Sequence, residues 1–257
     1  MQKSPDAVAL DASASHNDSM SLRILIIACT LLIGGCATTA PLPQTTPGVA
    51  ADAPQPSAKV AELGWRRILL QHQWDKEKTP DWSMDLLLAG ELLGPGIDRY
   101  RDQLRYWRFH RRAGNDSTGH QLSLLLYTDQ ATASAIYQQV LDHPWTPELL
   151  ATDLKRISHR GINHNSEPAI ADRSDPNWSP EMMRAWPAYI TGVSELWLAL
   201  IRDYRSQQPL PSALAAARKR YAAIDKRLTD TWQEEGQHAL LHHLSALFGY
   251  RPLLIRY

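Results

Sequence analysis

The chain has few cysteines, few phenylalanines and no net charge. Its 257 residues include two of each, and 27 basic residues balance 27 acidic ones. Both cysteines, Cys29 and Cys36, lie near the start, so the rest of the chain is predicted to have no disulfide and no cysteine nucleophile. A neutral chain argues against bulk nucleic-acid binding, which needs a basic surface. A P-loop and a dinucleotide fingerprint are also missing.

Long hydrophobic runs are absent too. The longest apolar stretch, ILIIACTLLI, covers residues 24–33 and contains ten residues. A helix of that length crosses about half of a ~30 Å hydrocarbon core, so it is too short for a membrane span. A short apolar segment that follows a basic residue, here Arg23, and ends in small residues is typical of a secretory signal.

The end of this segment, Ile33-Gly34-Gly35-Cys36, resembles the lipobox of bacterial lipoproteins. The resemblance covers residues 20–36. It implies that the thiol of Cys36 receives a diacylglycerol, that the chain is cut before Cys36, and that the new amino group is acylated, commonly with palmitate. It also implies anchoring to a membrane through these acyl chains. Alanine at position 37, rather than aspartate, favours the periplasmic face of the outer membrane. An ordinary signal peptide with a chance cysteine is the alternative.

Three regions follow from composition. Residues 1–35 are predicted to form the signal peptide, and we expect the true start at Met20, because the first 19 residues are acidic and poorly suited to a signal. Residues 36–58 hold the lipidated cysteine and a tether rich in Pro, Thr and Ala, which cannot build a core. Residues 59–257 are long enough for one globular domain. They resemble no family that we can name.

Hydrophobic periodicity predicts an α+β, helix-dominated single domain. Alternating apolar residues predict a small antiparallel sheet near residues 104–127, from strands over 104–112 and 120–127, with a third strand over 155–162. Helical patterns are expected over residues 61–73, residues 83–93 up to Gly94-Pro95-Gly96, the segment after the N-cap Asp129, and the segment from Thr146.

The C-terminal third predicts an antiparallel helical part. Helices are expected to start at Pro180 and again at Pro187, and apolar stripes continue through 190–204 and 214–228. A further helix is expected over 237–248, followed by an edge strand over 251–257. The preceding stretch, residues 161–179, shows no periodicity, and long loops of this kind are functional or disordered.

Three groups of residues are candidate sites. On a helix, Glu235, His238 and His242 share one face and could bind a divalent metal, although a polar face that happens to hold histidines is the simpler interpretation.

In the 161–179 loop, carboxylates near a histidine and an aromatic platform suit glycan cleavage or binding, although Asp and Asn also form turns; these residues are His164, Glu167, Asp172, Asp175 and Trp178.

The third group is a run of arginines interleaved with aromatic residues in the first strand of the sheet. Arg108 and Arg111 could hold a phosphate or carboxylate, although arginines that alternate across a strand more simply cover the sheet with their stems.

Together these features favour a lipid-anchored envelope protein that acts by binding a protein or glycan partner, without enzymatic activity or a cofactor. The alternatives are an envelope hydrolase that uses the 161–179 loop and a metal-binding accessory protein that uses residues 235–242.

Overall fold

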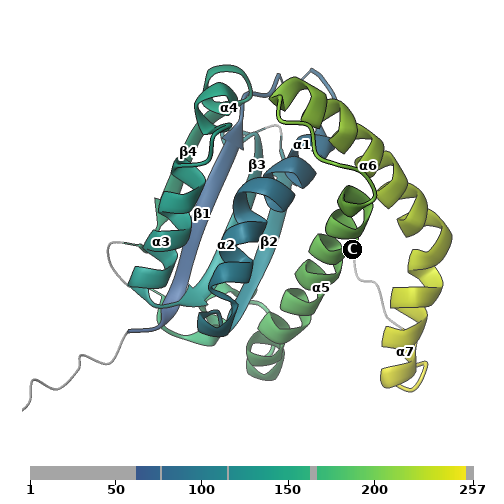
Figure 1. Ribbon diagram of the computed structural model, residues 1–257. Coiled ribbons are helices and arrows are strands. Elements are labelled where there is room, and N and C mark those ends of the chain that lie inside the picture. Colours follow the sequence, from purple (N-terminus) through teal and green to yellow (C-terminus); the bar gives the residue numbers. More distant parts are fainter. Residues whose placement is uncertain (1–61, 76, 115, 163–166, 253–257) are drawn as a thin grey trace, which may run out of the picture. The chain divides into compact units, whose positions relative to one another are not determined.

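The computed structural model describes residues 62–75, 77–114, 116–162 and 167–252, which belong to one compact unit, Ser57–Tyr257 (Figure 1). The predicted signal, Cys36 and the tether lie outside the described residues, as do His164 and residues 253–257 of the predicted edge strand. The described part has an antiparallel sheet of four strands and a larger helical content, which confirms the α+β, helix-dominated prediction.

The sheet has the strand order β2-β3-β1-β4, and every neighbouring pair is antiparallel. Its strands are β1 (Gly64–His72), β2 (Tyr106–Ala113), β3 (His120–Thr128) and β4 (Leu154–Arg160). The strands predicted over 104–112, 120–127 and 155–162 are therefore confirmed. Strands β2 and β4 form the two edges, and β1 and β3 lie in the centre.

The predicted helix over residues 61–73 is wrong, because this segment forms strand β1. Its side chains are buried on both faces of the sheet: Ile68 and Leu70 face the main core, while Trp65 packs on the opposite face. A central strand buried on both sides has a near-continuous apolar sequence without clear alternation. Such a run cannot be distinguished from a buried helix by periodicity alone.

A second correction concerns the helix that starts near residue 83. Helix α1 (Trp82–Leu87) begins where the Asp81 side chain accepts hydrogen bonds from the Ser83 and Met84 amides. It continues through a π-helical segment, η1 (Leu88–Leu93), into α2 (Gly94–Arg99), instead of ending at Gly94-Pro95-Gly96. Pro95 lies within this continuous helical stretch, directly after η1.

The predicted helices after Asp129 and from Thr146 are confirmed as α3 (Gln130–Leu141) and α4 (Thr146–Thr152). Short 3₁₀ turns lie at η2 (Arg101–Gln103) and η3 (Ile170–Arg173).

The two helices expected from Pro180 and Pro187 are in fact one helix, α5 (Pro180–Ser206). Pro187 cannot donate to the carbonyl of Met183, four residues earlier. The Ser174 hydroxyl, from the preceding loop, donates to that carbonyl at 2.7 Å and satisfies it. A tertiary contact therefore compensates for the proline, and α5 continues through it.

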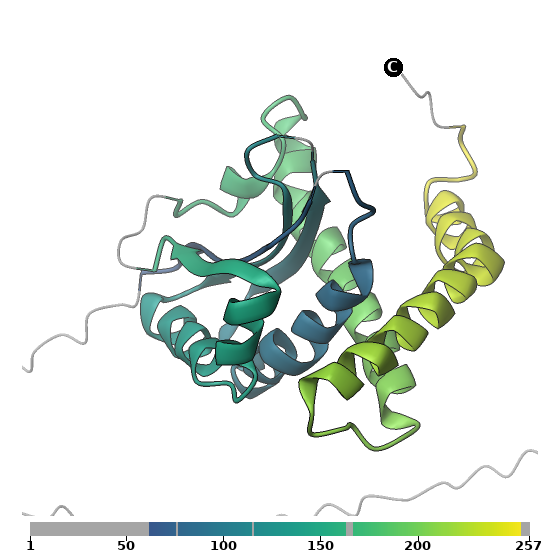
Figure 2. The same cartoon turned by 90° about the horizontal axis from the view of Figure 1, so that it is seen from above.

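Helix α6 (Leu214–Gly236) continues through the π-helical η4 (Gln237–His242) into α7 (His243–Leu247), so the separately predicted helix over 237–248 is an extension of α6. Arg251 and Pro252, the described residues of the predicted edge strand, have no strand structure. The first turns of α6 lie beside α1, and the later turns lead away from the sheet (Figures 1 and 2).

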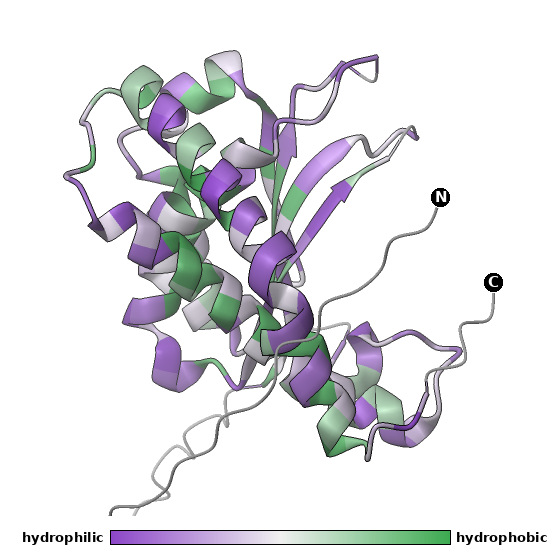
Figure 3. Ribbon diagram, turned by 90° about the vertical axis from the view of Figure 1, so that its right-hand side faces the viewer, coloured by the Kyte–Doolittle hydropathy of each residue, from purple (hydrophilic) through white to green (hydrophobic). Residues whose placement is uncertain are grey.

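The main core lies between one face of the sheet and the helices. The sheet contributes alternate residues of each strand, and η1 and the start of α6 close the core from the other side; the largest fully buried members are Tyr221, Ile68, Leu70, Leu86, Leu87, Leu88, Leu92, Leu93, Ile97, Leu122, Leu124 and Leu126. The long helices carry both polar and apolar stretches along their ribbons (Figure 3).

Candidate functional site

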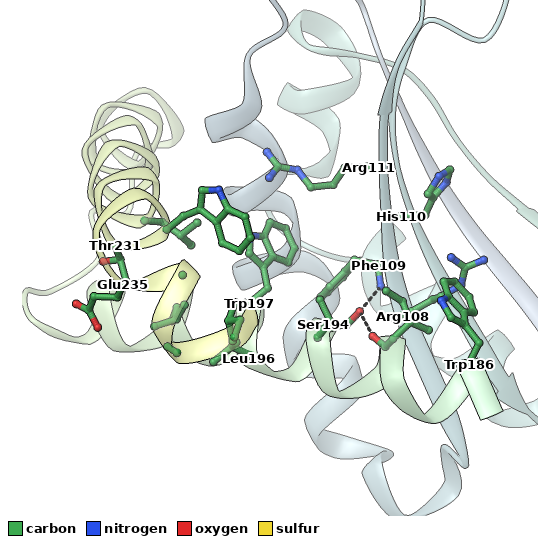
Figure 4. A pocket seen from close by; sticks show the side chains of 18 residues that line it. Arg108, Phe109, His110, Arg111, Trp186, Ser194, Leu196, Trp197, Thr231 and Glu235 are labelled. Carbon is green, nitrogen blue, oxygen red and sulfur yellow. Dashed lines mark hydrogen bonds between the residues drawn. The ribbon is translucent and has the colours of Figure 1, made fainter. Parts of the chain in front are cut away.

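An apolar cleft of about 600 Å³ lies between strand β2, helix α5, the second half of α6 and segment η4. Figure 4 shows Trp197 and Leu196 of α5, Thr231 and Glu235 of α6, and Arg108 and Arg111 of β2 around it. The remaining lining residues are mostly apolar: Phe109, His110, Trp186, Ile190, Val193, Ser194, Leu200, Leu228, Trp232, Gly236, Ala239 and Leu240.

Helix α5 is held against the edge strand β2 by side-chain hydroxyl groups. The amide of Trp107 donates to Thr191 Oγ1 at 3.2 Å, and the amide of Phe109 donates to Ser194 Oγ at 3.1 Å. Ser194 in turn donates to the carbonyl of Ile190 at 2.9 Å (Figure 4). These contacts satisfy two amides of an edge strand that would otherwise be open to another strand. They also fix the α5 wall of the cleft.

The cleft leaves large apolar side chains exposed. Leu196 is 39% exposed, Val193 40% and Trp232 55%. The apolar stripe of α5 was expected to be covered by the next helix. In the structure α6 contacts α5 but diverges from it toward η4, and part of the stripe faces the cleft (Figures 1 and 2).

Arg108 belongs to the cleft lining, but its guanidinium lies across β2 from Arg111, beside Trp186, and has no carboxylate partner among the described residues (Figure 4). Its guanidinium stacks on Trp186, 4.6 Å from the ring centroid, and donates to the Arg173 carbonyl at 3.3 Å. The buried Nε atom has no hydrogen bond. Desolvation, with a contribution from the charge of Arg173, lowers the Arg108 pKa to about 10. The group is therefore a poorly solvated cation at neutral pH.

Arg111, unlike Arg108, has a carboxylate partner. Its guanidinium lies between the rings of Trp82 and Trp197, at 4.9 and 5.1 Å from their centroids. Its Nε atom donates to Asp85 Oδ2 at 2.9 Å, and Nη2 donates to the Trp82 carbonyl at 2.9 Å. The charge of Arg111 is therefore balanced within the protein.

Asp85 also belongs to a buried cluster with His72 and His120. The Asp85 Oδ1 atom lies 2.9 Å from His72 Nε2, and Oδ2 lies 3.3 Å from His120 Nε2. The two imidazole rings stack, with centroids 3.9 Å apart and planes within 6°. Burial by itself raises the Asp85 pKa, but the hydrogen bond from His120, the close approach of His72 and the charge of Arg111 outweigh burial and hold the pKa well below its usual range. Asp85 is therefore a carboxylate.

The predicted residues of the 161–179 loop lie in local interactions. Glu167 pairs with Arg173 at 2.6 Å, and Asp172 accepts a hydrogen bond from the Ala169 amide at 2.7 Å. Asp175 accepts one from the Asn177 amide at 2.9 Å. Trp178 lies beside Trp186, with ring centroids 5.3 Å apart. These contacts shape the loop, and its role in hydrolysis stays a prediction.

The histidines of the other predicted site lie on the C-terminal rod, the continuous helical stretch formed by α6, η4 and α7. The rings of His238 and His242 stack with centroids 5.2 Å apart, while Glu235 lines the cleft. Within the described ranges, the side chains whose metal-ligating atoms converge, all within 4.8 Å of one another, are His72, Asp85 and His120. This cluster could hold a metal ion, whereas a metal at Glu235, His238 and His242 stays a prediction.

The sequence analysis missed the His72–Asp85–His120 cluster. The sequence pattern that marks it is a histidine at the end of a row of alternate apolar residues that face the core. In β1, His72 follows Ile68 and Leu70, and in β3, His120 precedes Leu122 and Leu124. Because the sequence predicts a helix over residues 61–73, it does not place His72 on the same strand face as Ile68 and Leu70. The unusual Asp85, inside the otherwise apolar sequence MDLLL, was a second signal.

No known protein family, no curated protein and no solved structure matches this chain. Within the described ranges, none of the helices combines the length and the apolar character that crossing a bilayer requires.

Proposed function

We propose that this is a lipid-anchored cell-envelope protein that binds an anionic amphiphile, a molecule with an apolar chain and one negatively charged group, in the cleft between β2, α5 and α6–η4. The observation that carries the proposal is Arg108, a guanidinium in the lining of an apolar cleft that has no carboxylate partner within the described part of the chain.

The apolar part of the ligand is supported by the lining and the volume of the cleft. Small-molecule sites enclose about 300–1,000 Å³ and combine apolar walls with a few polar groups, and the cleft, at about 600 Å³, falls within this range. Exposed Val193, Leu196 and Trp232 would be transferred from water to the ligand surface on binding. Burial of apolar surface contributes about 25 cal/mol per Å².

The charges around the cleft support a negatively charged group on the ligand. Arg111 is already paired with Asp85, so its charge is satisfied. Arg108 is stacked on Trp186, and none of the described carboxylates pairs with it, so a carboxylate or phosphate of a ligand could accept paired hydrogen bonds from it. Glu235, on the opposite wall, would disfavour an anion at that end of the cleft. The ligand is thus expected to orient with its charged end at Arg108.

The anchor rests on the resemblance of Ile33-Gly34-Gly35-Cys36 to a lipobox. We expect radioactive palmitate to label the protein in bacterial cells, and Cys36→Ala to remove the label and release the protein from the membrane fraction. Equal labelling of both forms would exclude lipidation at Cys36.

A titration of the purified protein with a fluorescent long-chain fatty acid tests the cleft. Trp232→Glu places a charge on the apolar wall at an exposed position, so the fold should tolerate it. We expect affinity to fall at least tenfold, equivalent to about 1.4 kcal/mol. The matched control is Tyr189→Glu, which adds the same charge at an exposed α5 position outside the cleft lining and should bind as the wild type does.

Two results would contradict the proposal: no saturable fatty-acid binding by the wild type, or equal loss of affinity in both variants. Absence of fatty-acid binding together with concentration-dependent dimerisation that Trp232→Glu abolishes would show instead that a second copy of the chain covers the cleft.

A further inference from the structure

We infer that His72, Asp85 and His120 form a binding site for a divalent first-row transition-metal ion. Its three ligands are not part of the amphiphile-cleft lining, although Asp85 pairs with Arg111, which does line that cleft. The three side chains come from β1, α1 and β3 and meet at one end of the sheet, where Gln71 of β1 pairs with Gln121 of β3.

The distances suit shared coordination. Ligand atoms that bind one ion at about 2.0–2.2 Å lie roughly 2.9–3.4 Å apart in common geometries. The distance from His72 Nε2 to Asp85 Oδ1, 2.9 Å, falls in this range, and one ligating atom from each of the three side chains lies within 4.8 Å of the others. Two imidazoles and one carboxylate also form a donor set that zinc and iron(II) accept.

Two atoms of the cluster lack the hydrogen bond that their proximity suggests. His72 Nε2 and Asp85 Oδ1 are buried, and neither makes a hydrogen bond of acceptable geometry, although they are 2.9 Å apart. A buried polar atom without a partner destabilises the folded state. A cation bound to both atoms would give each of them a partner.

Arg111 binds the Asp85 carboxylate without being a proposed metal ligand itself. Its Nε atom binds Asp85 Oδ2, which leaves Oδ1 to face His72. Hydrogen bonds to the second oxygen of a carboxylate ligand orient that ligand toward the ion. The stacked rings are nearly parallel, so binding one ion in both ring planes requires one imidazole to turn about its Cβ–Cγ bond. Metal binding should therefore change the ring stacking.

The site has access to solvent through a second hollow. His72 and His120 form part of the lining of a cavity of about 470 Å³, which is also lined by Trp74, Asp116 and Lys155. Three protein ligands beside an open hollow leave coordination positions for water or for a small ligand. The same hollow provides an entry path for the ion.

Zinc titration of the purified full chain, free of any histidine tag and treated with a chelator, tests the site by calorimetry. We expect one zinc ion per chain and at least tenfold weaker binding in His120→Ala and His72→Asn. The control is His238→Ala, which removes an exposed histidine of the C-terminal rod and should leave affinity unchanged. Trp232→Glu, which is designed to weaken amphiphile binding, should bind zinc with the affinity of the wild type. The two proposals can therefore fail independently.

Circular dichroism establishes whether each variant is folded. Should the substitutions in the buried cluster unfold the chain, imidazole NMR signals of the wild type decide the question. Zinc should shift the signals of His72 and His120 and leave those of His238 and His242 unchanged. The inference is overturned when the wild type binds no zinc, when His238→Ala alone abolishes binding, or when the shifted signals belong to His238 and His242.

Discussion

At the residue scale, the chemistry of the cleft depends on what surrounds two arginines of one strand. Arg108 and Arg111 lie three positions apart in β2, and their side chains therefore leave opposite faces of the sheet. Arg111 meets Asp85 and two indole rings, so its charge is neutralised. Arg108 meets Trp186 and a backbone carbonyl. Sequence identified both as candidate anion ligands, but only the structure distinguishes a paired guanidinium from an unpaired one.

Asp129 provides a residue-scale prediction about stability and pH. Its carboxylate caps α3 by accepting hydrogen bonds from the Thr132 amide at 2.8 Å and from the Thr132 hydroxyl at 2.9 Å. Burial raises its pKa, but these hydrogen bonds outweigh burial and lower it. Asp129→Ala should reduce the free energy of unfolding at neutral pH by about 1 kcal/mol, the usual value of an N-cap.

Because the folded-state pKa is lowered, this stabilisation is present above the ordinary aspartate pKa of about 3.9 and is lost as pH falls through the lower folded-state value. Urea unfolding at pH 7 and near pH 3 should therefore show a difference between wild type and Asp129→Ala that shrinks in acid. Asp142→Ala, at the other end of α3, is the control and should cost less at pH 7. An Asp129→Ala difference that is the same at both pH values would refute this role.

At the scale of elements, local signals identified much of the fold. Strand β3 begins with Gln121 and Ser123 on one face and Leu122 and Leu124 on the other, and α3 has an N-cap followed by an apolar stripe, so both elements were predictable. Strand β1 was not, because burial on both faces erases the alternation that marks a strand. The continuity of α5 was also hidden, since the Ser174 hydroxyl that satisfies the Met183 carbonyl lies outside the helix.

The candidate sites depend on contacts between elements, which is why sequence identified them incompletely. Arg108 and Arg111 were recognised from composition within one strand. The histidine cluster combines β1, α1 and β3, and the two histidines are 48 positions apart. Spacing along the chain carries no signal for such a set. It becomes visible only when the register of β1 against β3 places residues 71 and 121 opposite each other.

At the scale of the whole described unit, the sheet and helices place two sites near one another without merging them. The cleft lies beside the edge strand β2, where α5 covers the sheet edge and α6–η4 diverges from α5. The histidine cluster lies at the end of the core-facing surface of β1 and β3. Arg111 belongs to both surroundings, because it lines the cleft and pairs with Asp85.

The central claim is that the cleft takes an apolar chain with a negative charge at Arg108. The most direct measurement compares the affinities for a long-chain fatty acid and for the alcohol of equal length. A charge-assisted hydrogen bond contributes about 1.5–3 kcal/mol, so the wild type should prefer the acid by at least tenfold. Arg108→Gln should abolish this preference, and Arg105→Gln, which removes an exposed arginine of neighbouring position, should retain it. Equal affinity of the wild type for acid and alcohol, or an unchanged preference in Arg108→Gln, would contradict the account.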